Sequence, residues 1–70
     1  MNELINSLPW YKKLLILRMA KGWSQEEAAQ ECCTSVKNYW NWERGINMPR
    51  KLSKRAIAAA FQVPLKEIFD

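Results

Sequence analysis

Two short helices joined by a tight turn are the feature that most limits the folds open to this sequence. Ser24 and Glu27 have the spacing of a capping box, in which the hydroxyl accepts from a backbone N–H and the glutamate reaches back to the cap. Ser35 is a second N-cap, and Gly45 is placed to end the helix that Ser35 begins. The sequence therefore predicts helices over residues 25–32 and 36–44.

Local signals predict three further helices. Pro9 is placed to open a helix and Gly22 to end it, so residues 10–21 are expected to be helical. Another helix is expected over residues 51–61, and Pro64 opens a last short one. The residues of helix 51–61 that are expected to be buried are Leu52, Ile57, Ala60 and Phe61, and the last helix carries Leu65, Ile68 and Phe69. Because no run of useful length alternates with period two, the predicted fold class is all-α with five helices.

Length and composition narrow the class of protein. Seventy residues suffice for one small domain, which we place at residues 10–70 after an N-terminal segment of residues 1–9. No apolar run approaches the roughly 20 residues of a membrane span, and Met1 to Leu4 lack the basic region of a signal peptide. The chain has no histidine and its two cysteines are adjacent, so we expect no metal site, no cofactor and no disulfide framework. A reduced, cytoplasmic protein is expected, with a vicinal disulfide or thiol sensing at Cys33 left as an alternative.

The positive charge of the chain is unevenly distributed. The formal net charge is +4, and residues 36–70 account for the whole excess. Most of the basic residues of that half lie between positions 37 and 55. Such clustering is typical of a surface that binds a polyanion, although a merely solvated surface is an equal alternative on charge alone.

The expected helix 36–44 has two different faces. Lys37, Trp40, Asn41 and Arg44 fall on one face at helical spacing, while Tyr39 and Trp42 point toward a core. Lysine and asparagine can hydrogen-bond the edges of DNA bases, so this outer stripe is suited to base recognition.

With these features the chain resembles the phage repressor/Cro type of helix-turn-helix, also called the xenobiotic-response-element (XRE) family, from about Trp10 to Phe69. The residues that carry the resemblance are Leu17-Arg18, Lys21-Gly22, Ser24-Gln25-Glu26-Glu27, Ala29, Ser35, Trp42-Glu43-Arg44-Gly45, Pro49, Ile57-Ala58, Val63 and Ile68-Phe69. The resemblance implies a five-helix, lambda-repressor-like domain. It also implies binding to double-stranded operator DNA, usually as a dimer, and a role in transcription regulation, with the third helix in the major groove.

The resemblance assigns roles to individual residues. Those expected to contact bases are Val36, Lys37 and Asn41. From its outward position on the same helix Trp40 is added to them, with burial against the N-terminal segment as the alternative. Those expected to contact the DNA backbone are Ser24, Gln25, Asn38, Arg44, Arg50 and Lys51. It further implies an ion pair between Arg18 and Glu43, which we expect to have a structural role.

The chain departs from the family pattern at a few positions. Cys33 stands where glycine is common, so either Cys33 is left-handed or the turn differs. Trp40 is larger than the polar residues usual at its position. Lys51 and Lys54 replace residues that are often apolar, which suggests a shifted register for helix 51–61.

Dimer contacts are expected from apolar residues that exceed one small core, namely Ile46, Met48, Leu65 and Phe69. Leu4, Ile5 and Leu8 are a second apolar set that could extend the first helix or join this interface.

No arrangement of residues supports catalysis, so we expect no enzyme. The predicted function is a sequence-specific regulator, a repressor of a phage, of a mobile element or of its own operon. The alternative is a protein-interaction module, an adaptor or antitoxin-like partner with the same fold.

Overall fold

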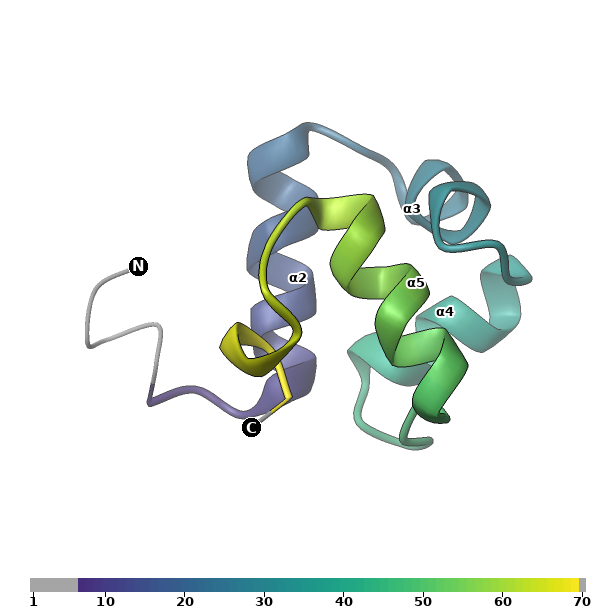
Figure 1. Ribbon diagram of the computed structural model, residues 1–70. Coiled ribbons are helices and arrows are strands. Elements are labelled where there is room, and N and C mark those ends of the chain that lie inside the picture. The colour runs from purple at the N-terminus through teal and green to yellow at the C-terminus, as the bar shows by residue number, and fades with distance from the viewer. Residues whose placement is uncertain (1–6, 70) are drawn as a thin grey trace.

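Four α-helices and one short 3₁₀ helix succeed one another in residues 7–69, the part of the chain that the computed structural model describes (Figure 1). Their bounds are α2 Trp10–Lys21, α3 Gln25–Glu31, α4 Val36–Glu43, α5 Lys51–Phe61 and η1 Leu65–Glu67. No strand occurs within residues 7–69, so the predicted all-α class is confirmed. The last of the five expected helices is only a three-residue 3₁₀ turn. That single turn is enough to bring Ile68, which is 1% exposed, into the core.

The predicted helix ends are confirmed with small shifts. Ser24 Oγ accepts from Glu27 N at 3.0 Å, and Glu27 Oε1 accepts from Ser24 N at 2.8 Å, which is the expected capping box. Ser35 Oγ accepts from Asn38 N at 3.1 Å. Gly45 has a φ of +73°, and a Cβ added there would lie 2.8 Å from Tyr11 Cδ1, so this position needs glycine for two reasons.

The turn between α3 and α4 settles the question raised by Cys33. Cys33 has a φ of +60°, so this cysteine itself takes the left-handed conformation that glycine usually supplies. Helix α3 ends at Glu31, one residue before the predicted end, and the N–H of Cys32 still bonds to Ala28 O at 2.9 Å.

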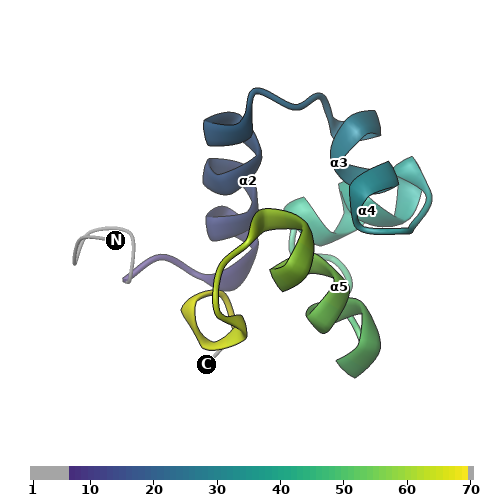
Figure 2. The same cartoon turned by 45° about the horizontal axis from the view of Figure 1, so that its top comes forward.

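The core forms where α2, α3, α4 and α5 meet: α2 packs directly against α4, and α5 packs against α2 and α3 (Figures 1 and 2). Ala28 and Ala29 are 0% and 2% exposed, and these small residues allow α3 to approach its neighbours closely. The buried core residues are Leu14, Ala28, Ala29, Cys32, Tyr39, Trp42, Ile57, Phe61 and Ile68. No helix within residues 7–69 is long and apolar enough to cross a membrane.

The prediction that Leu52 is buried is wrong, because its side chain is 78% exposed. Helix α5 buries Ile57, Ala58 and Phe61. Leu52 lies five residues before Ile57, which rotates it by about 140° around the helix, away from the core. Leu65, which was expected to exceed the core, is 38% exposed.

Candidate nucleic-acid interface

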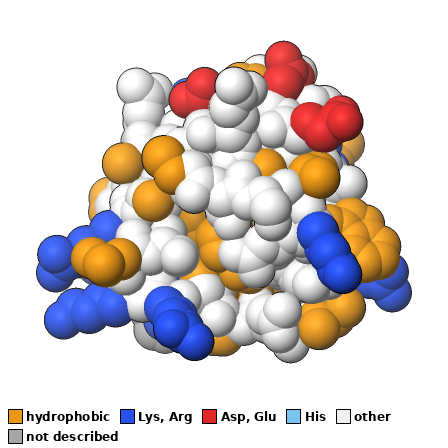
Figure 3. All heavy atoms as spheres, turned by 90° about the vertical axis from the view of Figure 1, so that its right-hand side faces the viewer, with side chains coloured by type: hydrophobic (Ala, Val, Ile, Leu, Met, Phe, Trp, Pro, Cys, Tyr) orange, Lys and Arg blue, Asp and Glu red, His pale blue; other side chains and the backbone are white. Residues whose placement is uncertain are grey.

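Helix α4 presents the expected stripe to solvent. Val36 and Trp40 are 45% and 40% exposed, Lys37 is exposed and Asn41 is half-buried. Tyr39 and Trp42 are buried on the other side of the helix, as expected. Figure 3 shows basic side chains at both flanks of the side that α3 and α4 occupy, and acidic side chains at its upper end.

Trp40 and Arg44 form a contact that the sequence did not indicate. The guanidinium carbon of Arg44 lies 4.3 Å from the centre of the Trp40 ring, the geometry of a cation–π interaction. The indole therefore supports the basic side chain that follows it by one helical turn.

The ion pair suggested by the resemblance is present between α2 and α4. Arg18 Nε donates to Glu43 Oε2 at 2.6 Å, and Arg18 Nη1 donates to Trp23 O at 2.9 Å. The two side chains are 17% and 5% exposed. The hydrogen bond to Glu43 raises the pKa of Arg18. Burial raises the pKa of Tyr39, and the nearby carboxylate of Glu43 raises it further. The buried Tyr39 hydroxyl has no hydrogen-bond partner among the described residues.

The two residues expected to contact phosphate at the start of α3 are already engaged within the protein. The hydroxyl of Ser24 serves the capping box, and Gln25 Nε2 donates to Glu43 Oε1 at 3.3 Å. Glu26 and Glu27 lie in the first turn of α3. Their negative charge opposes the attraction that a helix N-terminus has for an anion.

The start of α5, unlike that of α3, carries no acidic side chain in its first turn. Arg50 is the N-cap without a side-chain cap hydrogen bond. The first backbone N–H groups of this helix therefore lack the acidic side chains that accompany those of α3.

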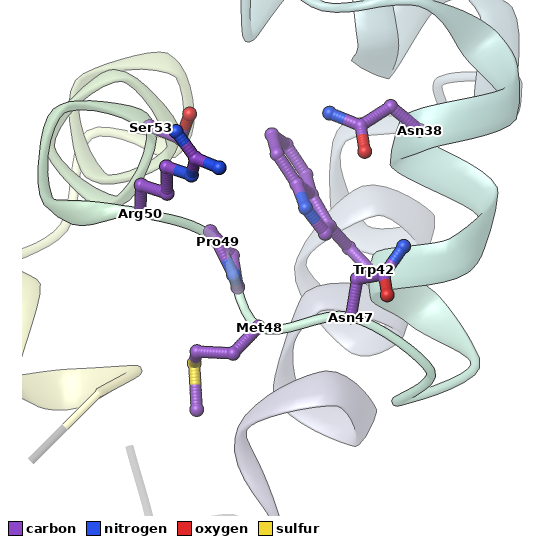
Figure 4. A pocket seen from close by; sticks show the side chains of 7 residues that line it. All are labelled: Asn38, Trp42, Asn47, Met48, Pro49, Arg50 and Ser53. Atoms are coloured by element: carbon purple, nitrogen blue, oxygen red, sulfur yellow. The ribbon is translucent and has the colours of Figure 1, made fainter.

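A pocket of about 350 Å³ opens between α4, the following loop and the start of α5 (Figure 4). Its lining residues are Asn38, Trp42, Asn47, Met48, Pro49, Arg50 and Ser53. Their polar groups include amides, a guanidinium, a hydroxyl and an indole N–H, with no carboxylate among them. Asn38 Nδ2 also donates to Thr34 Oγ1 at 2.7 Å.

The pocket is lined by some residues that the sequence analysis assigned to DNA contacts and by others that it did not. Asn38 and Arg50 were expected at the DNA backbone, whereas Asn47 and Ser53 were not singled out and Trp42 was expected only in the core. The signal in the sequence was a set of hydrogen-bonding residues around Pro49, ahead of a helix without an acidic first turn. Lys51 is exposed beside the pocket but does not line it.

The residues expected at a dimer interface are only partly brought together. Ile46 and Met48 are 59% and 54% exposed. Phe69 is half-buried rather than fully exposed, and its ring centre lies 5.8 Å from that of Trp10. Met48 and Phe69 line one further pocket, whereas Ile46 and Leu65 do not line it. Of the second apolar set, Leu8 is half-buried, and Leu4 and Ile5 lie outside the described residues.

The two cysteines have different surroundings. Cys32 is buried, and burial raises the pKa of its thiol to about 12, whereas Cys33 is exposed. Within residues 7–69 no group of three or more histidine, cysteine or acidic side chains is placed to hold a metal ion.

The sequence matches the helix-turn-helix family model HTH_3 over residues 14–68. The chain belongs to this Cro/C1-type helix-turn-helix family. No curated protein and no solved structure gives a significant match. The helix-turn-helix is formed by α3 and α4, and the family supports sequence-specific binding to DNA and regulation of transcription.

Proposed function

We propose that this helix-turn-helix domain is a transcriptional repressor that places α4 in the major groove of an operator. The observation that carries the proposal is the exposed stripe of α4, on which Lys37 and Asn41 lie one turn apart. In this role Lys37 donates to guanine, Asn41 pairs with adenine, and Val36 and Trp40 contact thymine methyl groups or sugars.

The backbone of the DNA is held on both sides of that helix. Arg44, supported by the Trp40 ring, contacts one phosphate. The pocket at the start of α5 receives another phosphate, with Arg50, Asn47 and Ser53 as donors. Its lack of carboxylates favours this assignment. Gln25 and Lys51 are further backbone contacts, and Gln25 keeps its hydrogen bond to Glu43 while its second amide N–H faces the phosphate.

The repressor acts in the cytoplasm on double-stranded operator DNA, as a weak homodimer that DNA completes, and controls a mobile element or its own operon. A single recognition helix reads only a few base pairs, so two copies are needed for useful specificity. Neither the proposed contacts nor their chemistry requires a cofactor.

The proposal is tested by selecting bound sequences from a random pool of duplex DNA and titrating the selected site at several salt concentrations. We expect one enriched sequence, and an affinity that falls with salt by a log–log slope of about −0.9 for each phosphate neutralised. Recovery of no preferred sequence, or binding that is insensitive to salt, would favour the protein-interaction module instead.

The phosphate pocket has its own matched control. Arg50→Ala should reduce the steepness of the plot of log affinity against log salt by about 0.9, the contribution of one phosphate contact. Arg55→Ala removes the same charge from an exposed position of α5 that does not line the pocket, and should change the slope less. Equal effects of the two substitutions would remove the pocket from the proposal.

A further inference from the structure

Two large apolar side chains lie exposed on the face of α4 that carries the proposed base contacts. Val36 and Trp40 are 45% and 40% exposed, and they are one helical turn apart. Each residue turns an α-helix by about 100°, so these two form one column, and Lys37 and Asn41 form a second column beside it. The base-reading face of α4 therefore has an apolar column next to a polar one.

The apolar column is held in a fixed position. The guanidinium carbon of Arg44 lies 4.3 Å from the centre of the Trp40 ring, so the cation covers one aromatic face and restricts rotation of the indole. Val36 is β-branched, and its χ1 angle has one strongly preferred value in a helix. The two side chains thus present a preformed apolar surface.

The charge around this column indicates what covers it. The one carboxylate of α4, that of Glu43, is 5% exposed and paired with Arg18, whereas Lys37 and Arg44 are exposed. The exposed face of the helix is therefore positive as well as apolar, which favours a polyanion over an apolar protein surface.

DNA offers two apolar surfaces, its sugars and the C5-methyl group that thymine presents in the major groove. Val36 is the first residue of α4, and the N-terminal residues of a recognition helix are those that lie at the base edges. This position favours the methyl group over the sugars.

We propose that Val36 and Trp40 bind the C5-methyl group of one pyrimidine in each half-site, so that the domain distinguishes thymine from uracil and 5-methylcytosine from cytosine. The inference rests on the proposed docking of α4 in the major groove. It adds a chemical sensitivity to that function, because methylation of a cytosine at this position of an operator strengthens binding.

The test replaces each thymine of the selected operator in turn by uracil, which lacks only the C5-methyl group, and measures the affinity of the unmodified chain. At one position of each half-site we expect the affinity to fall about fourfold, the effect of leaving one methyl-sized group unburied. At the same position, a probe with 5-methylcytosine should bind more tightly than a probe with cytosine by the same factor.

Three variants assign the effect to the column. Trp40→Ala should bring the ratio of thymine to uracil affinities close to one, although the loss of support for Arg44 also weakens binding to both probes. Trp40→Phe keeps an aromatic wall and should keep most of the ratio. Met19→Ala, at a position on α2 that is 66% exposed, is the matched control and should leave the ratio unchanged.

The outcomes separate this proposal from the proposed function. Equal affinities for thymine and uracil at every position, or a ratio that Trp40→Ala leaves unchanged, would overturn methyl recognition by the column while salt-dependent binding to the selected operator still supports the repressor. If no sequence is selected, or if binding is insensitive to salt, the proposed function fails as well. The comparison of thymine with uracil uses the unmodified chain and so does not depend on the folding of any variant.

Discussion

Cys33 and Gln62 are the two non-glycine residues with a left-handed backbone in residues 7–69, with φ of +60° and +58°. Gln62 ends α5, and its side-chain oxygen accepts from Lys21 Nζ at 3.1 Å. Cys33 is exposed and its conformation costs about 1–2 kcal/mol relative to a right-handed backbone. The strain at Cys33 therefore has no evident compensation from its side chain.

Cys33→Gly should raise the free energy of unfolding by about 0.5–1 kcal/mol, because glycine takes the left-handed conformation without a steric penalty. Urea denaturation measures the change. Cys33→Ala removes the thiol but keeps the strain, and should lie within about 0.5 kcal/mol of the original chain. If both variants have the same stability, strain at this position is not the cause.

Cys32 makes stability depend on alkaline pH. Burial raises the pKa of its thiol from 9.0 to about 12, so folding favours the neutral form. This contribution is fully present below pH 9 and is lost as the pH rises from 9 towards 12, by up to about 1.4 kcal/mol per pH unit. Tyr39 adds a similar loss above pH 10, since burial raises its pKa from 10.0.

Unfolding free energies measured between pH 8.5 and 10 should therefore fall for the original chain. The fall should be smaller in Cys32→Ala and unchanged in Cys33→Ala, whose thiol is exposed. The same decline in all three proteins would show that Cys32 does not cause it.

Base recognition is also a matter of single residues. Lys37→Ala and Asn41→Ala should each cost about 1–3 kcal/mol at one operator position and relax the preference for that base. Arg44→Ala should weaken binding to every sequence alike. Titrations on the selected site and on single-base variants distinguish the two patterns, and equal losses on specific and random DNA would remove Lys37 and Asn41 from base reading.

Between elements, the Arg18–Glu43 pair joins α2 to α4, and Gln25 adds α3 to the same group. Arg18→Met should destabilise the domain by about 3–5 kcal/mol, because it leaves the carboxylate of Glu43 buried without its partner. Adding Glu43→Leu should recover much of that loss, since two apolar side chains then replace the pair. Denaturant unfolding of the single and double variants forms the cycle, and additive losses would show that the two residues are not coupled.

The order and ends of the helices could be predicted from the sequence because the signals are local. A serine cap with its glutamate, or a glycine after the last turn, acts within a few residues of its position. The exposure of Leu52 and the burial of Lys13 could not be predicted in this way, because they depend on how α5 and α2 are rotated against distant partners. The hydrogen bond from Gln25 to Glu43, which joins residues 18 positions apart, was missed for the same reason.

At the scale of the whole molecule, dimerisation on DNA is the main expectation. Ile46, in the loop between α4 and α5, is 59% exposed, and an interface built from so few apolar residues implies weak self-association in solution. On a palindrome with half-sites about 34–36 Å apart, binding should be cooperative, while light scattering of the free protein reports monomer at low concentration.

Ile46→Asp should reduce this cooperativity without changing affinity for a single half-site. Met19→Asp, at a position on α2 that is 66% exposed, is the matched control and should leave cooperativity intact. A saturated complex with one copy on one half-site would contradict dimerisation.

Met48 is a wall common to the two pockets, since it lines both the one beside Arg50 and the one around Lys13. A ligand that moves this side chain in one pocket also changes the shape of the other. By thermodynamic linkage such an effect is reciprocal: if a ligand in one pocket lowers the affinity of the other pocket by some factor, occupation of the second lowers the affinity of the first by the same factor. Met48 is thus the side chain through which occupation of one pocket would alter binding in the other.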